Sequence, residues 1–235
     1  MKQIFYITSR TTVNSTFRTQ TLAKHSLPSQ NGLMAYIPII EPAEAEGYLK
    51  ETYTQAKKRA GRVFNILKIM SHSPQALRAS MDFYLAIMQG RSPLSHAQRE
   101  MLATVVSTTN HCHYWTQAHG ADFRDEVQDD EQAETLKNEW RNAKLTQIDR
   151  ALCGWAEKLT RNPHTASQDD VTELQKSGLS IKAISDAAQI IGYFNYINRV
   201  ADGLGVDLEK EMPPASIWSK ISLTVVPVKF YVLFF

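Results

Sequence analysis

The sequence predicts an all-α protein built as a bundle of helices. Apolar residues between Glu41 and Glu211 recur mostly at spacings of three and four, which is the pattern of helices with one buried face. Capping residues stand at the expected helix boundaries, and no alternating run of apolar and polar residues indicates a strand there. With 235 residues, 43% of them hydrophobic, the chain can bury a core in one or two domains, and two cysteines are too few for a disulfide-stapled secreted scaffold.

Three pairs of residues mark helix starts. Each has the spacing of a capping box, in which a side-chain oxygen accepts from a backbone N–H three residues later and the later side chain reaches back. They are Ser95 with Gln98, Thr146 with Asp149, and Ser167 with Asp170. Prolines fall where helices begin, and glycines, Gly120 among them, fall where we expect helices to end. The expected helices are 44–60, 62–70, 75–90, 95–108, 111–121, 146–161, 168–177 and 180–203.

The charge is unevenly distributed along the chain. The formal net charge is +2, from 26 basic and 24 acidic residues. Six of the basic residues and none of the acidic ones lie before Glu41 or after Glu211, so residues 41–211 carry a net charge of −4. This balance argues against a nucleic-acid partner, because such proteins concentrate positive charge on the folded domain.

The two ends differ in composition from the middle. Residues 1–34 are rich in Ser and Thr and contain no acid, so we expect a flexible or transit-like extension, with a gene-model error as an alternative. Residues 35–214 form the predicted helical domain, and residues 215–235 form an apolar tail, either a buried or partner-facing strand or an exposed sticky end. Lys220, Pro227 and Lys229 interrupt this tail, so we expect no membrane span. The expected location is the cytoplasm, with the mitochondrion as the alternative.

Residues 99–123 hold the candidate chemistry. Glu100 opens an apolar helix, and Cys112 lies in the first turn of the next helix, where the helix dipole and free N–H groups lower the pKa of a thiol. His119 follows two turns later on the same face. A carboxylate, a thiol and an imidazole in one pocket can activate a sulfur nucleophile, although a buried cysteine and a structural histidine are the common alternatives. Adjacent residues point about 100° apart on a helix, so His111, Cys112 and His113 cannot share a metal ion, and we expect none.

The helix expected at 180–203 also carries polar residues near its end. They are Asn195, Asn198, Arg199 and Asp202. A solvated or intersubunit face is the main interpretation, and a role in lining the site is the alternative.

Several positions together resemble a known superfamily. The frame consists of Glu100, Ala103, Val106, Ser107, Asn110, Cys112 and His119. It resembles the AhpD-like, carboxymuconolactone decarboxylase-like superfamily. The segments IPIIEP, DRALCGWAEKLTRNP and GYFNYINRVADGLGV resemble its peroxidase-related branch, and the resemblance spans Ala35 to Pro214.

The resemblance implies an all-helical homo-oligomer whose C-x-x-C pair reduces hydroperoxides. In that family the second cysteine attacks the peroxide, the first resolves the sulfenic acid and meets an external thiol reductant, and Glu and His relay protons. By position, Glu100, Cys112 and His119 are the implied catalytic residues, with no cofactor, metal, nucleic acid or membrane involved.

This sequence departs from the family at one position, where Trp115 replaces the second thiol. Without two thiols one turn apart, Cys112 cannot close a local disulfide. If Cys112 attacks peroxide alone, an outside thiol must reduce its sulfenic acid, unless Cys153, which we expect in the core, serves as a distant partner. Three hypotheses therefore stand: an antioxidant peroxidase, a thiol-independent lyase of the carboxymuconolactone decarboxylase type, and a non-catalytic oligomer whose pocket Trp115 fills.

Overall fold

The computed structural model describes residues 35–212, and the predicted extension and tail lie outside these residues. The described part is helical throughout, with no strand, which confirms the predicted all-α class. The α-helices are α1 (Gly47–Ala60), α2 (Asn65–Ile69), α3 (Pro74–Met88), α4 (His96–Thr109), α5 (His113–Val127), α6 (Asp130–Glu139), α7 (Gln147–Arg161), α8 (Gln168–Lys176) and α9 (Ile181–Leu204). Two short 3₁₀ turns, η1 (Trp140–Asn142) and η2 (Pro163–Thr165), flank α7.

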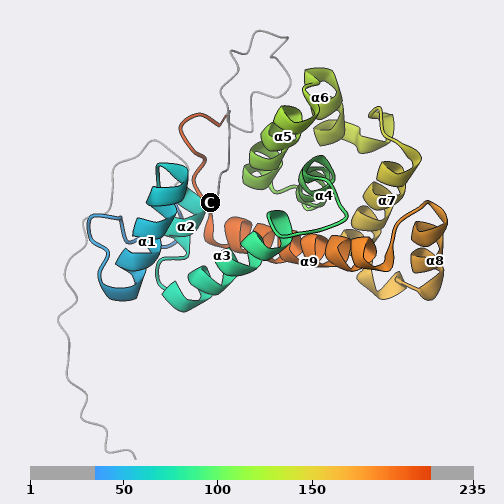
Figure 1. Cartoon of the computed structure of the whole chain (residues 1–235). Coiled ribbons are helices and arrows are strands. Elements are labelled where there is room, and N and C mark those ends of the chain that lie inside the picture. Colours follow the sequence, from blue (N-terminus) through green and yellow to red (C-terminus); the bar gives the residue numbers. More distant parts are fainter. Residues whose placement is uncertain (1–34, 213–235) are drawn as a thin grey trace, which may run out of the picture. The chain divides into compact units, whose positions relative to one another are not determined.

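The helix α4 is the centre of the bundle. It packs against α5, α7 and α9, and Figure 1 shows it end-on between α5 and α7, above the long α9. Every residue from Arg99 to Ser107 is buried, as expected for a helix surrounded on all sides. No helix among residues 35–212 is long and apolar enough to cross a membrane.

The predicted capping pairs form at three helix starts. Ser95 Oγ accepts from the Gln98 N–H at 3.1 Å, and Gln98 Oε1 accepts from the Ser95 N–H at 3.0 Å. Thr146 Oγ1 accepts from the Asp149 N–H at 3.1 Å. At the start of α8, the Asp170 carboxylate accepts from the Ser167 N–H at 2.9 Å. These bonds satisfy backbone groups that the helix itself leaves without partners.

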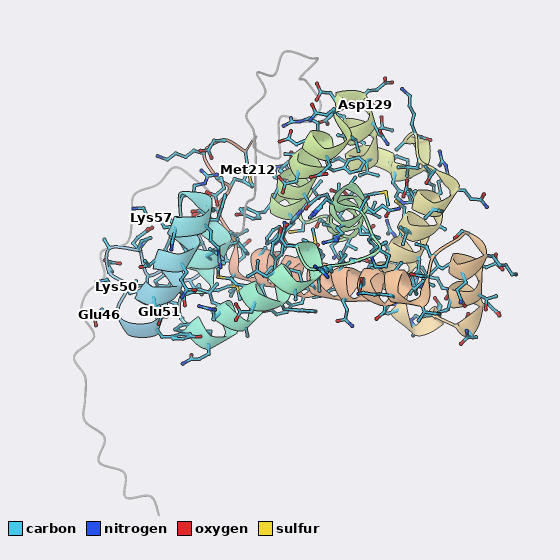
Figure 2. The ribbon with its side chains drawn as sticks, viewed as in Figure 1. Glu46, Lys50, Glu51, Lys57, Asp129 and Met212 are labelled. Carbon is cyan, nitrogen blue, oxygen red and sulfur yellow. The ribbon has the colours of Figure 1, made fainter. Side chains whose placement is uncertain are left out.

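The sequence-based prediction was wrong between residues 121 and 140. Helix α5 continues to Val127, and α6 follows after a short turn. The side chain of Asp129, labelled in Figure 2, starts α6 by accepting from the Gln132 N–H at 2.9 Å. Helix α6 buries only Ala133 and Leu136, so its apolar pattern was too sparse to be recognised.

Gly120 lies inside α5 and does not end a helix, contrary to expectation. Its role is close approach, because a Cβ at this position would lie 2.4 Å from Cδ of Lys137. The aliphatic part of the Lys137 side chain therefore lies directly on the backbone of α5 at Gly120. Because this position has no side chain, α6 can pack close to α5 next to His119.

Candidate active site

Glu100 and His119 form a buried pair between α4 and α5. His119 Nδ1 lies 2.5 Å from Glu100 Oε2, the distance of a strong hydrogen bond. His119 is 0% exposed and Glu100 is 7% exposed. The structure thus brings together two of the residues singled out from the sequence.

Burial shifts the pKa values of this pair in opposite directions. Desolvation, with a contribution from the negative charge of Glu126, raises the pKa of Glu100 to about 8. Desolvation lowers the pKa of His119 to about 4. Both shifts favour the uncharged pair, a carboxylic acid hydrogen-bonded to a neutral imidazole, and this arrangement can pass a proton without a net buried charge.

Trp115 covers one face of the imidazole. Its ring is stacked on that of His119, with centroids 5.2 Å apart and an interplanar angle of 16°. Phe194 of α9 meets both rings edge-on, at 4.6 Å from His119 and 5.8 Å from Trp115. Trp115 is 1% exposed, so its indole is a fully packed part of the core.

A small cavity lies beside Trp115. Its volume is about 10 Å³, which is about the space needed for one water molecule. Apolar side chains of α2, α3 and α9 line it together with Tyr84 and the hydrogen-bonded pair Ser80 and Tyr193, whose hydroxyl oxygens are 3.2 Å apart. A cavity of this size has no room for an organic substrate.

Cys112 stands at the other end of α5, where it is the N-cap residue. Its thiol is buried, and within residues 35–212 it makes no hydrogen bond to Glu100 or His119; the carbonyl of Asn198 is 4.0 Å from Sγ. The expectation of a lowered pKa was wrong. Burial raises the pKa of Cys112, a hydrogen bond to Asp202 raises it further, and the backbone N–H groups at the helix start do not compensate.

A network of amides holds the α4–α5 turn against α9. Asn110 Nδ2 donates to Oδ1 of Asn198 at 3.0 Å and to Oδ1 of Asn195 at 3.2 Å. Asn198 Nδ2 donates to Ser107 Oγ at 3.2 Å. Asn198 is 0% exposed, so it is not on a solvated face, and Ser107 and Asn110 act by positioning the turn.

The part of the chain that contains α4 and α5 matches a known family. The model of the carboxymuconolactone decarboxylase family matches residues 74–153, from α3 into α7. No protein of curated function matches the chain. Among solved structures, an uncharacterized peroxidase-related protein from Silicibacter sp. TM1040 is 28% identical, with a TM-score of 0.67 over 82% of this chain and 97% of that chain. An uncharacterized peroxidase-related protein from Ralstonia eutropha JMP134, described as an alkylhydroperoxidase AhpD core, is 25% identical, with a TM-score of 0.70 over 76% and 94% of the two chains.

The family match over residues 74–153 and these two structures support placing the chain in the AhpD-like superfamily. Its fold is also that of a more distant protein, the debrominase Bmp8 in complex with 2,3,4-tribromopyrrole, at 14% identity and a TM-score of 0.64 over 77% of this chain and 95% of that one. AhpD-like folds therefore occur in proteins whose names denote different reactions.

The other cysteine of this chain, Cys153, is a core residue. Cys153 lies in α7, is 0% exposed and is unbridged, as is Cys112. Burial raises its pKa, so the thiol is protonated and inert at neutral pH.

Asp122 is a site residue that the sequence reasoning missed. Its Oδ2 lies 3.9 Å from His119 Nδ1, and the three-residue spacing of His119 and Asp122 on α5 is the signal that could have found it. Donor atoms of Glu100, His119 and Asp122 all lie within 4.8 Å of one another, and their types suit a zinc-class cation. The 2.5 Å contact between Glu100 and His119 is too short to admit an ion between them, so we read it as a shared proton.

Proposed function

We propose that this chain is an AhpD-like protein of the hydroperoxide-reducing type whose thiol chemistry is switched off at Trp115. The observation that carries the proposal is the indole of Trp115, packed in the core and stacked on His119. The proton relay of Glu100 and His119 is kept, but an indole stands where the resemblance places the attacking thiol.

The chemistry shows why a relay alone is insufficient. A thiolate attacks one oxygen of a hydroperoxide, the O–O bond breaks, the thiol becomes a sulfenic acid, and a proton from the relay converts the leaving oxygen to an alcohol. A second thiol then displaces water and forms a disulfide, which an external dithiol reduces. Cys112 is a poor substitute for the attacking thiol, because it is buried, its pKa is raised, and it makes no hydrogen bond to the relay.

The test is to restore a thiol at position 115. We expect the purified native chain to show no catalytic consumption of cumene hydroperoxide with a dithiol reductant, and Trp115→Cys to show turnover. Trp115→Ala is the matched control, because it removes the indole without supplying sulfur. Circular dichroism of each variant establishes that it is folded before rates are compared.

Each outcome decides the proposal. Turnover by Trp115→Cys alone, lost again when Cys112→Ser is added, supports it. Turnover by the native chain equal to that of Trp115→Cys would show that position 115 is not the switch. A folded Trp115→Cys without activity would show that the scaffold is not of the hydroperoxide-reducing type.

A second candidate function is a thiol-independent proton transfer, such as a lactone decarboxylation. It is favoured by the intact Glu100 and His119 pair and by the family match over residues 74–153, since neither requires a second sulfur. Activity on a lactone acid that is lost in Glu100→Gln and unchanged in Cys112→Ser would establish it. The homo-oligomer, the external thiol reductant and the cytoplasmic or mitochondrial location stay predictions.

A further inference from the structure

We propose that Asp122 is the proton-exchange residue that connects the buried Glu100 and His119 pair to solvent. The inference deepens the proposed function, since it concerns how the relay is loaded and unloaded. It is nevertheless tested on the resting protein, so it does not depend on turnover.

The histidine of the pair needs such a connection because aromatic residues pack around its ring. The ring of His119 is stacked against Trp115, touched edge-on by Phe194 and approached by Tyr84 at a centroid distance of 6.2 Å. The first two carry no group that exchanges protons near neutral pH. Tyr84 is buried and its pKa is raised well above the usual value, so its hydroxyl stays protonated and does not reach solvent.

Two acidic residues, Asp122 and Glu126, follow His119 along α5. Within residues 35–212, the carboxylates within 4.0 Å of a His119 ring nitrogen belong to Glu100 and Asp122. The side chain of Asp122 is 12% exposed, compared with 9% for Glu100 and 0% for His119. Glu126 lies one further turn along α5, is exposed, and acts electrostatically on Glu100. These residues form a stripe from the buried pair to the surface.

The distance of 3.9 Å suits intermittent transfer. A proton moves over a direct hydrogen bond of about 2.6–3.2 Å or through one water, and a small side-chain rotation or one bridging water closes the gap. A proton leaves the pair for the Asp122 carboxylate, which then gives it to water and is regenerated. The reverse order reloads the pair, and charge balances at each step.

The experiment measures exchange of the shared proton with water by nuclear magnetic resonance in the full native chain. A hydrogen bond as short as 2.5 Å gives a proton resonance at low field, and His119→Gln, which removes it, assigns the signal. Saturation transfer from water then gives the exchange rate. We expect Asp122→Asn to slow this exchange on the order of 100-fold, the scale of a positioned acid–base group.

Two variants separate proton exchange from a structural role. Asp122→Glu keeps a carboxylate and should retain fast exchange. Asp125→Asn is the matched control, because Asp125 lies on the same helix in an ion pair with Arg124, and its removal should leave the rate unchanged. Exchange of core backbone amides in α4, measured in the same samples, reports any change in global opening.

Selective slowing in Asp122→Asn, with recovery in Asp122→Glu, supports the proposal. An unchanged rate in a folded Asp122→Asn overturns it, as does equal slowing by Asp125→Asn or by Asp122→Glu. If Asp122→Asn does not fold, Asp122→Ser, which also lacks a carboxylate, takes its place: slower exchange supports the proposal, and an unchanged rate overturns it. An inactive Trp115→Cys enzyme would contradict the proposed function and leave this result unaffected.

Discussion

The two ends of the α4–α5 hairpin use burial in opposite ways. At the relay end, burial raises the pKa of Glu100 to about 8, which brings the group close to neutral pH, where proton donation and acceptance are both accessible. At the thiol end, burial raises the pKa of Cys112 and moves the group away from neutral pH. The same physical effect therefore prepares an acid for proton transfer and makes a thiol inert.

The partners at each end also differ. The rings of Trp115 and Phe194 pack against His119 and make no hydrogen bond to it among the described residues. Side-chain amides and a hydroxyl surround the turn before Cys112 and fix it by hydrogen bonds to α9. Aromatic packing around one strong hydrogen bond thus maintains the relay end, and a network of side-chain hydrogen bonds maintains the thiol end.

The largest expected effect is a loss of stability when a substitution breaks the packing at the relay end. Trp115→Ala removes a fully buried indole, and we expect it to lower the free energy of unfolding by about 3–5 kcal/mol, as large-to-small core substitutions do. Urea denaturation of the native chain and the variant measures the difference. A loss below about 1 kcal/mol would mean that the indole contributes little to the core.

A smaller loss of stability is expected when a substitution removes hydrogen bonds at the thiol end. Asn198→Ala leaves Ser107 Oγ and one amide contact of Asn110 without a partner in a buried place, which costs about 1–3 kcal/mol. Gln189→Ala, which removes an exposed amide on the same helix, is the control and should change stability by about 0.5 kcal/mol or less. Equal effects of the two substitutions in urea denaturation would contradict the role given to the network.

The smallest expected effect is a loss of stability at alkaline pH, which tests whether the pKa of Cys112 is raised. Because the folded pKa of Cys112 is raised, the unfolded chain loses this thiol proton first, so stability is intact below pH 8.5 and falls above it. At pH 9.5 the native chain should lose about 1.4 kcal/mol more than Cys112→Ser, relative to pH 7. Equal losses in the two proteins, measured by denaturation at both pH values, would mean that the thiol titrates normally.

The fold was largely predictable because most of its helices carry local sequence signals, namely capping residues and apolar spacing. Ser95, Thr146 and Ser167 stand at real helix starts, and the apolar spacing of α4 and α9 marks their burial. Helix α6 escaped prediction, since two buried residues do not make a visible stripe. Its capping aspartate, Asp129, was a signal that could have been used.

The candidate site was predictable in part. Spacing and family resemblance both pointed to Glu100 and His119, and the structure brings them together. The shift in the pKa of Cys112 was predicted in the wrong direction. A position at a helix start can be recognised from the local sequence, whereas desolvation by distant residues such as those of α9 cannot. Asp122 went unnoticed for a similar reason, as its importance depends on how deeply His119 is buried.

The packing of Trp115 also bears on the history of this chain. Codons for tryptophan and cysteine differ by one base, so a thiol at position 115 is a single mutation away. The indole, however, touches Tyr114, His119 and Phe194, and a small side chain in its place would open a void among them. A mutation to cysteine would therefore carry a loss of stability from the start, whatever chemistry the new thiol supplied.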